Sequence, residues 1–154
     1  MGEIERIADQ LKRAFEGEAW HGPSVRELLA TTTCGQAAER PIPGAHTIWE
    51  IVVHMGVWES VVRRRLLGET IADLAPEQDW PAVENATEPA WRKALEELEQ
   101  GHLQMRQAIA QLTDKLLDDT VSGKGYSIYV MLHGVIQHNL YHAGQIAILK
   151  KALA

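Results

Sequence analysis

The sequence predicts an all-α fold, a four-helix bundle with one long crossover connection, in a single domain over residues 1–154. Apolar residues recur at three- and four-residue spacing in four long segments, which is the pattern of amphipathic helices. Capping residues precede these segments, and glycines and prolines separate them. Short alternating segments exist, but none is flanked by hairpin turn residues, so we expect no sheet. Four amphipathic helices bury their apolar stripes by packing against one another as a bundle.

The composition is that of an ordinary globular domain. The 154 residues are 45% hydrophobic and 23% charged, and a chain of this length can bury roughly two thirds of the surface that it exposes when unfolded. The net charge is −6. Non-specific binding to nucleic acid comes mainly from clustered Lys and Arg, so we expect no nucleic-acid partner. The one basic run, Arg63-Arg64-Arg65, is predicted to be a solvated helix end.

Three features predict a cytoplasmic protein without a membrane partner. The N-terminal residues alternate acidic and basic side chains and lack the continuous apolar core of a signal peptide. No apolar run approaches the ~20 residues that span a bilayer. Cys34 is the single cysteine, so it cannot form an internal disulfide.

The first predicted helix covers residues 3–16. Its apolar residues have helical spacing: Ile4, Ile7, Ala8, Leu11 and Phe15. After a break at His21-Gly22-Pro23, Ser24 can cap a short helical turn through Leu28 and Leu29. Residues 31–45 hold two prolines and two glycines among polar residues and are predicted to be a loop.

The second long helix has a clear predicted start. Thr47-Ile48-Trp49-Glu50 fits the capping box, in which the Thr hydroxyl accepts a backbone N–H three residues on and the Glu reaches back. The helical pattern continues to about Leu67, and Gly68 is placed to end it. Residues 69–86 contain Pro76 and Pro81 and are predicted to be the long crossover.

Two further helices complete the predicted bundle. Thr87 and Pro89 open the third, whose apolar residues are Trp91, Leu95, Leu98, Met105, Ile109 and Leu112. Gly123-Lys124-Gly125 then breaks the chain. Ser127 can cap a fourth helix that continues nearly to the C-terminus.

The last predicted helix carries two histidines one turn apart. At about 100° per residue, His138 and His142 lie about 40° from each other. They share their face with four apolar residues, Met131, Val135, Ile146 and Leu149. By the same arithmetic His133 lies about 140° from His138 and points elsewhere. The second helix carries His54 on the same face as Ile51, Trp58 and Val61. We therefore expect His54, His138 and His142 to point into the bundle.

Three inward imidazoles suit one divalent metal ion. A buried imidazole with an unpaired ring nitrogen costs roughly 1 to 3 kcal/mol, and a metal ion removes this cost by accepting the lone pair. Histidines at i and i+4 can reach one ion, and a third from a facing helix completes half of its coordination shell. The alternative is that each is a hydrogen-bonded core histidine. The residues alone leave both interpretations open.

No other residue earns a functional role from its position. Glu50 lies about 40° from the face of His54, and Gln145 could either orient a ligand or form a hydrogen bond inside the bundle. Neither is assigned as a general base, so the catalytic residues stay unknown. Other candidates are given no role or a weak one: Trp49, Trp58, Trp80 and Trp91 are expected to pack, His21, His46 and His102 have no pairing pattern, and Cys34 is a weak candidate nucleophile.

Two segments resemble the DinB-like superfamily, the DNA-damage-inducible and YfiT-like metal-binding four-helix bundles. The first is SVRELL followed by PIPGAHTIWEIVVHMGVWE, within residues 24–59. The second is MLHGVIQHNLYHAGQIAILKKA, at residues 131–152, where two histidines are followed by Gly144 and Gln145 in an apolar helix. With the matching order of helices, the resemblance covers nearly the whole chain.

The resemblance implies a metal ion held by His54, His138 and His142, the same three residues that share the inward faces. It implies zinc or nickel as the ion and a bundle with a long crossover. Characterised members are metal-dependent transferases of low-molecular-weight thiols, with some isomerases and many proposed hydrolases. The implied substrate is a small molecule, with a thiol cosubstrate, and DNA binding is not implied.

Two classes of function stay open. One is a metal-dependent enzyme that acts on a small molecule by thiol transfer or hydrolysis. The other is a non-catalytic, metal-binding stress-response bundle in which the ion satisfies buried histidines. An open cleft beside the ion favours the enzyme, and a fourth protein ligand favours the structural role. We also expect a homodimer, because Leu140, Gly144 and Ala147 form a strip of mostly small residues opposite the histidines.

Overall fold

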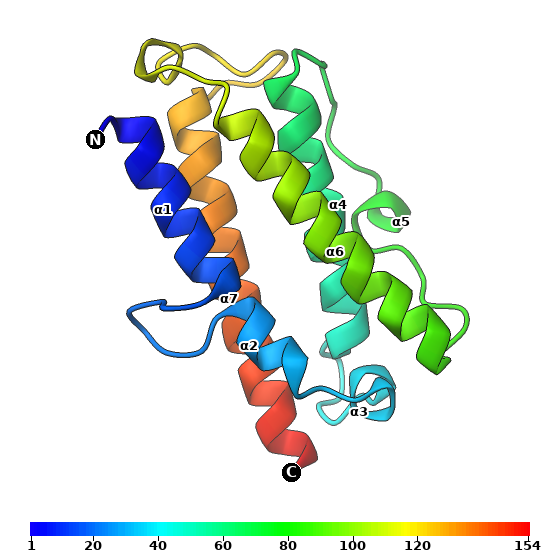
Figure 1. Cartoon of the computed structure of the whole chain (residues 1–154). Helices are drawn as coiled ribbons and strands as arrows, with labels where there is room; N and C mark the ends of the chain where they lie inside the picture. The colour runs from blue at the N-terminus through cyan, green and yellow to red at the C-terminus, as the bar shows by residue number, and fades with distance from the viewer.

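The chain folds into seven α-helices and one short 3₁₀ helix, with no β-strand (Figure 1). The computed structural model describes all of residues 1–154. In chain order the elements are α1 (Glu3–Glu16), α2 (Val25–Ala30), α3 (Cys34–Ala38), α4 (Ile48–Leu66), α5 (Pro76–Asp79), α6 (Glu88–Ile109), η1 (Asp114–Leu116) and α7 (Ile128–Leu153). The all-α prediction is confirmed.

The four longest helices are the four that the sequence predicts, and they lie along one another. In Figure 1, α1 and α7 run from the top of the view to the bottom, while α4 and α6 both run from bottom to top. The segment 67–87 returns the chain along the outside of the molecule between α4 and α6. Helix α4 packs against α6 and α7, and α1 packs against α7 and α6. Helix α4 thus contacts both of the long helices that follow it in the chain.

Side-chain caps begin the helices where the sequence predicts them. The hydroxyl of Thr47 accepts a hydrogen bond from the Glu50 N–H (3.1 Å), and the Glu50 carboxylate accepts one from the Thr47 N–H (2.7 Å). Ser24, Thr87 and Ser127 cap α2, α6 and α7. Helix α4 ends at Leu66, and the following Gly68 has φ +93°, a left-handed conformation that favours glycine.

Two details of the predicted helices are wrong, and the long connection contains one short helix. The predicted loop 31–45 contains α3, which starts with a capping box formed by Thr33 and Gln36. The prediction relied on the Gly and Pro content of the segment and overlooked this box. The connection between α4 and α6 contains α5, which starts at Pro76. The Gln78 side chain caps this start by accepting a hydrogen bond from the Ala75 N–H (3.0 Å). Helix α6 ends at Ile109, so Leu112 packs from the turn that follows it.

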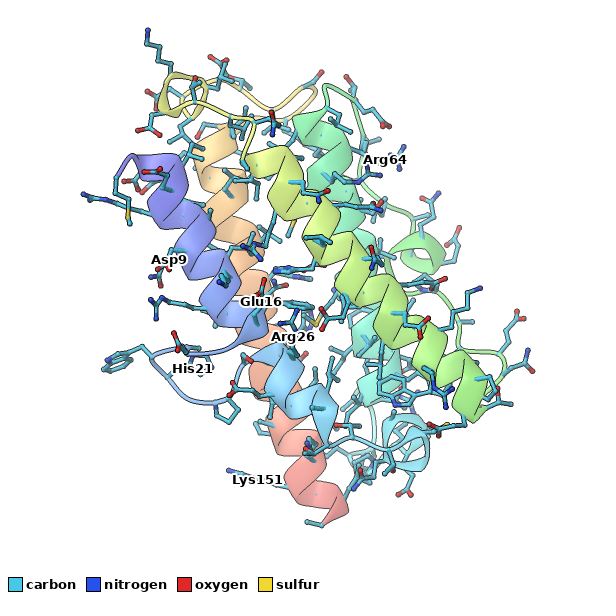
Figure 2. All side chains as sticks on the ribbon, viewed as in Figure 1. Asp9, Glu16, His21, Arg26, Arg64 and Lys151 are labelled. Carbon is cyan, nitrogen blue, oxygen red and sulfur yellow. The ribbon has the colours of Figure 1, made fainter.

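The basic run at the end of α4 is only partly solvated. Arg64 is exposed and pairs with Glu69 (2.7 Å), and Figure 2 shows it on the outer side of α4. Arg65, however, is buried with 7% of its surface exposed. It lies three and four residues after Val62 and Val61, so it shares their inward face. The predicted solvated helix end is therefore wrong for Arg65.

The core consists of two apolar clusters, one toward each end of the long helices. One gathers the first half of α4, the first half of α6 and the last half of α7 around α2; its buried members are Phe15, Val25, Leu29, Ala37, Ile48, Trp49, Ile51, Val52, Met55, Trp91, Leu98, Ala143, Ile146 and Leu149. The other joins α1 to the opposite halves of α6 and α7; its buried members are Ile4, Ile7, Leu11, Ala14, Val62, Met105, Ile109, Leu117, Val121, Met131, Leu132, Val135 and Ile136.

A buried polar layer lies between the two clusters. Glu59 of α4 is fully buried, and its Oε1 accepts hydrogen bonds from His102 Nδ1 of α6 (3.1 Å) and Asn139 Nδ2 of α7 (3.4 Å). The His102 ring stacks on Phe15 of α1 with centroids 3.8 Å apart. The second oxygen of Glu59 has no partner. Side chains of α4, α6 and α7 therefore meet at a single buried carboxylate, and α1 packs on one of them.

The polar layer continues to the surface through Glu16 at the end of α1. A Glu16 oxygen lies 4.0 Å from His102 Nε2 and is also bonded by Arg106. Figure 2 shows Glu16 and Arg26 of α2 close together beside α6, and their charged atoms lie 3.7 Å apart. Ion pairs this exposed contribute little to stability.

Glu59 should make the stability of the protein depend on pH. Burial raises its pKa above the ordinary 4.5, against the opposing effects of His102 and Asn139 and with a smaller contribution from the charge of Glu99. The folded protein then holds this proton more tightly than the unfolded chain. The free energy of unfolding therefore falls as pH rises from the ordinary Glu pKa through the folded one.

We expect this fall to be missing in Glu59→Gln, which cannot ionise. Denaturant unfolding of both chelator-treated proteins, from about pH 4.5 to about pH 8, measures the difference between them at each pH. Titrating groups that do not contact Glu59 are common to the two proteins and cancel in that difference. A difference that does not change with pH would contradict a raised pKa for Glu59.

No helix has the length and apolar character needed to cross a membrane. The strip expected at a dimer interface lies on α7, where Gly144 is exposed and Leu140 and Ala147 are partly buried. Exposed Tyr141 and Ile148 flank Gly144. The homodimer stays a prediction.

Candidate metal centre

The fold brings together the three histidines that the sequence singles out. His54 comes from α4, and His138 and His142 come from α7. The Nε2 atom of His138 lies 3.0 Å from that of His54 and 3.1 Å from that of His142. The candidate ligand atoms all lie within 4.8 Å of one another. His54 and His142 are buried at 5% and 3% exposure, and His138 is partly buried.

Two of the rings are held by hydrogen bonds on their outer nitrogens. His54 Nδ1 donates to the backbone carbonyl of Asp79 (2.8 Å) and also lies 3.1 Å from its carboxylate. His142 Nδ1 donates to the Gln145 side-chain oxygen (2.6 Å). A proton on Nδ1 leaves the Nε2 lone pair free, so both lone pairs face the centre of the cluster. Gln145 therefore orients a histidine, one of the two roles considered for it from the sequence.

The crossover segment supports the site from outside. Trp80 stacks on the His54 ring with centroids 3.8 Å apart and planes 4° from parallel, and its other partner is His46, at 3.5 Å and 3°. The Asp79 carboxylate accepts a hydrogen bond from Trp58 Nε1 (2.7 Å). Trp80 is thus more than a packing residue, and sequence analysis missed both it and Asp79. The proline at the start of α5 was the one local signal for an ordered segment there.

Burial keeps the three imidazoles neutral. It lowers the pKa of His138 to about 3, and the neighbouring His142 and His54 lower it further. Burial also lowers the pKa of His142 to about 4, although the bond to Gln145 opposes the shift. The pKa of His54 is lowered by burial too, against the effect of Asp79. At neutral pH the cluster therefore presents lone pairs and no positive charge.

The residues fit a divalent metal ion. His138 Nδ1 is buried without a partner, so the proton of this ring can sit on either nitrogen. A proton on His138 Nε2 can form a hydrogen bond with only one of the two neighbouring Nε2 atoms. A proton on His138 Nδ1 leaves three Nε2 lone pairs facing one another. Imidazole nitrogens bind zinc at about 2.0–2.1 Å, which sets two ligands roughly 3 Å apart. One cation accepts every lone pair, and three neutral nitrogens are a donor set that zinc and nickel accept.

The cluster has three candidate protein ligands and a pocket next to one of them, His138. No fourth His, Cys, Asp or Glu belongs to it. A pocket of about 310 Å³ lies next to His138, between α4 and α7, and six of its nine lining residues are hydrophobic. Three protein ligands beside an apolar pocket resemble a catalytic metal site more than a closed structural one.

The other residues considered from the sequence lie elsewhere. Glu50 is engaged by Thr47, Arg40 (2.7 Å) and His46 (3.3 Å) at the start of α4. His133 packs against Tyr129, with ring centroids 4.4 Å apart, and is not in the cluster. The remaining candidates are likewise apart: His21 is exposed, Cys34 is at the start of α3, and His102 belongs to the polar layer.

Replacing Gln145 with leucine should weaken metal binding by about 10- to 100-fold, because an acceptor on the outer nitrogen of a ligating histidine contributes that much to affinity. Leucine is similar in size to glutamine but cannot accept a hydrogen bond from His142 Nδ1. Competition with a chromogenic chelator measures the change. Gln137→Leu is the matched control, because Gln137 lies on the same helix and is exposed. Equal affinity in the two variants would show that Gln145 does not act on the site.

Comparison with known proteins places the chain in a family. The DinB superfamily matches residues 19–146, a span that includes all three histidines and the crossover. Neither the search of curated proteins nor that of solved structures found a match. The match covers more than half of the chain and agrees with the resemblance found in its two motif segments. An all-helical fold with three histidines gathered between α4 and α7 fits a metal-binding protein of this family, and the chain belongs to the DinB superfamily.

Proposed function

We propose that this protein is a metal-dependent enzyme that transfers a low-molecular-weight thiol to a small electrophilic molecule, with His54, His138 and His142 holding a zinc or nickel ion. The scaffold would be a four-helix bundle of α1, α4, α6 and α7 with a long crossover before α6. Hydrolysis at the same site is the second reaction open to this chemistry. The observation that carries the proposal is the convergence of three Nε2 atoms, with a pocket of about 310 Å³ next to His138.

The chain's own residues would prepare the site in three ways. Asp79 and Gln145 hold His54 and His142 with their lone pairs inward. Burial keeps the rings unprotonated, so metal binding has no proton to displace at neutral pH. Trp58 and the aliphatic residues of the pocket limit water around the reacting group.

A divalent ion held by three neutral imidazoles supplies a Lewis acid that favours the deprotonated form of a thiol or of water at neutral pH. No carboxylate or further histidine of the cluster is placed as a general base. We therefore assign proton removal to no residue. Thiol is preferred over water because the family resemblance favours transferases.

The test is a panel assay of metal-loaded and chelator-stripped protein. It offers several cellular thiols with a generic aromatic electrophile, and ester and amide substrates are run in parallel. We expect thiol consumption by the loaded protein, loss of it after stripping, and recovery when zinc or nickel is restored. His142→Ala should behave as the stripped protein, and His133→Ala should behave as wild type.

Turnover that survives stripping, or that His142→Ala retains, would rule out metal catalysis at this site. Ester or amide cleavage without thiol transfer would move the assignment to hydrolysis. Tight metal binding with no turnover on the whole panel would favour the other class, a stress-response bundle in which the ion joins α4 to α7.

A further inference from the structure

The pocket beside His138 contains a buried cation without a carboxylate partner. Arg65 lines this pocket and is 7% exposed. No carboxylate oxygen lies within 4.0 Å of its guanidinium, while Arg64 next to it pairs with Glu69. Asp73 pairs with Lys124 (2.5 Å), and this contact is the main reason that the pKa of Asp73 is lowered, with only a small contribution from the charge of Arg65. A charge removed from water in this way is costly unless something compensates it.

The hydrogen bonds of Arg65 use only part of its capacity. Its Nη1 donates to the Tyr126 hydroxyl (2.9 Å) and its Nη2 to the Ile71 carbonyl (3.1 Å). The Nε–H is buried and has no partner. A guanidinium has five N–H donors, so these two hydrogen bonds leave three of them without a partner in the protein. The ring of Trp58, 6.0 Å from the guanidinium carbon, and the C-terminal end of α4 compensate the charge in part.

The rest of the pocket is apolar and extends from the histidines to Arg65. On α7 its lining runs from His138 back to Val130, eight residues or about 12 Å of helix. On α4 it runs from Trp58 to Arg65, the helix that also carries His54. A residue without a side chain, Gly134, contributes to the wall between the two ends. A Cβ added there would meet no atom within 4 Å.

We propose that this pocket binds a small, mostly apolar molecule with one anionic group, and that Arg65, assisted by Tyr126, binds the anion. This inference rests on the proposed function, because it takes that molecule to be the electrophilic substrate of the three-histidine site. The anion would lie near the C-terminal end of α4, the apolar body would lie against Trp58, and the far end would reach His138.

The chemistry of Arg65 favours a planar, singly charged group. A guanidinium offers parallel N–H donors that match the two oxygens of a carboxylate. The volume of about 310 Å³ is at the lower end of the range for ligand pockets. A large polar anion such as a nucleotide does not fit such a space. A carboxylate on a short alkyl chain or a single aromatic ring does.

The experiment compares matched acids and amides on chelator-stripped protein, where no metal ion can bind the carboxylate. The probes are phenylacetate with phenylacetamide, and hexanoate with hexanamide. Binding is measured by calorimetry and by chemical shifts of pocket amides. We expect each acid to bind about 10- to 100-fold more tightly than its amide, the range for one charge-assisted hydrogen bond. In Arg65→Met, which keeps length and loses charge, the acid and the amide should bind alike.

Three results would overturn the inference: equal binding of acid and amide to wild type, a preference for the acid that persists in Arg65→Met, or no binding of any of the four probes. Gly134→Leu keeps Arg65 and fills the pocket, so it serves if Arg65→Met does not fold. This variant should no longer bind the two acids, while its metal content should stay that of the wild type. Binding of the acids to Gly134→Leu would also contradict the proposal. Because the probe-binding measurements use stripped protein and involve no turnover, the proposed anion site can fail while the panel assay succeeds, and the reverse.

Discussion

Replacing His138 with alanine should remove stoichiometric metal binding. His138 Nε2 is the atom that lies next to both other candidate ligands, at 3.0 and 3.1 Å. Without it, two imidazoles on different helices remain. Loss of an outer hydrogen bond alone weakens a metal site about 10- to 100-fold, so loss of a ligand should weaken it by more than about 100-fold. Metal content should fall from about one ion per chain to a small fraction of that.

Elemental analysis measures this on protein purified without chelator or metal-affinity resin. His133→Ala is the matched control, because His133 lies on the same helix outside the cluster. It should keep the metal of the wild type. Full metal content in His138→Ala would remove His54, His138 and His142 as the ligand set, and loss in both variants would point to a general effect on α7.

Replacing Glu59 with alanine should destabilise the protein by about 3 kcal/mol or more. The substitution leaves the His102 and Asn139 donors buried without an acceptor, at roughly 1 to 3 kcal/mol each. It also opens a cavity where α4, α6 and α7 meet. Removing the cost of the buried carboxylate offsets part of this loss. Breaking one side of a buried polar pair costs about 3 to 5 kcal/mol in comparable cases.

Urea unfolding of chelator-treated protein measures the loss. Glu96→Ala is a suitable control because Glu96 is exposed on α6, where such changes stay within about 0.5 kcal/mol. If Glu59→Ala unfolds at the same urea concentration as Glu96→Ala, the buried carboxylate contributes nothing net to the fold.

Local sequence signals predicted the helices and the histidine cluster well. Thr47 with Glu50 and Ser127 mark helix starts through contacts within one turn, which depend on no distant residue. The histidines were found because spacing along a helix fixes which side chains share a face. The convergence of His54 with the pair on α7 needed tertiary structure, and the family resemblance supplied the expectation.

The parts that the sequence did not predict depend on contacts between distant segments. Asp79 and Trp80 reach His54 only because the crossover folds back along α4, and nothing in their local sequence specifies that path. Glu59 and His102 are 43 residues apart and pair across two helices. Arg65 was assigned to solvent as part of the short basic run at the predicted end of its helix. Its position three and four residues after buried valines was the better signal.

The polar layer divides the interior into two apolar halves, and each half should open as a separate cooperative unit in amide hydrogen exchange. Helices α4, α6 and α7 cross the layer, where Glu59, His102 and Asn139 replace the apolar packing found on either side. The candidate ligands of α7, His138 and His142, also lie between the two clusters along that helix. An ion held there with His54 would join α4 to α7 where the apolar packing is interrupted. In the metal-free protein, slowly exchanging amides on the two sides of the layer should therefore have different opening free energies. In the metal-bound protein, these opening free energies should converge on one value.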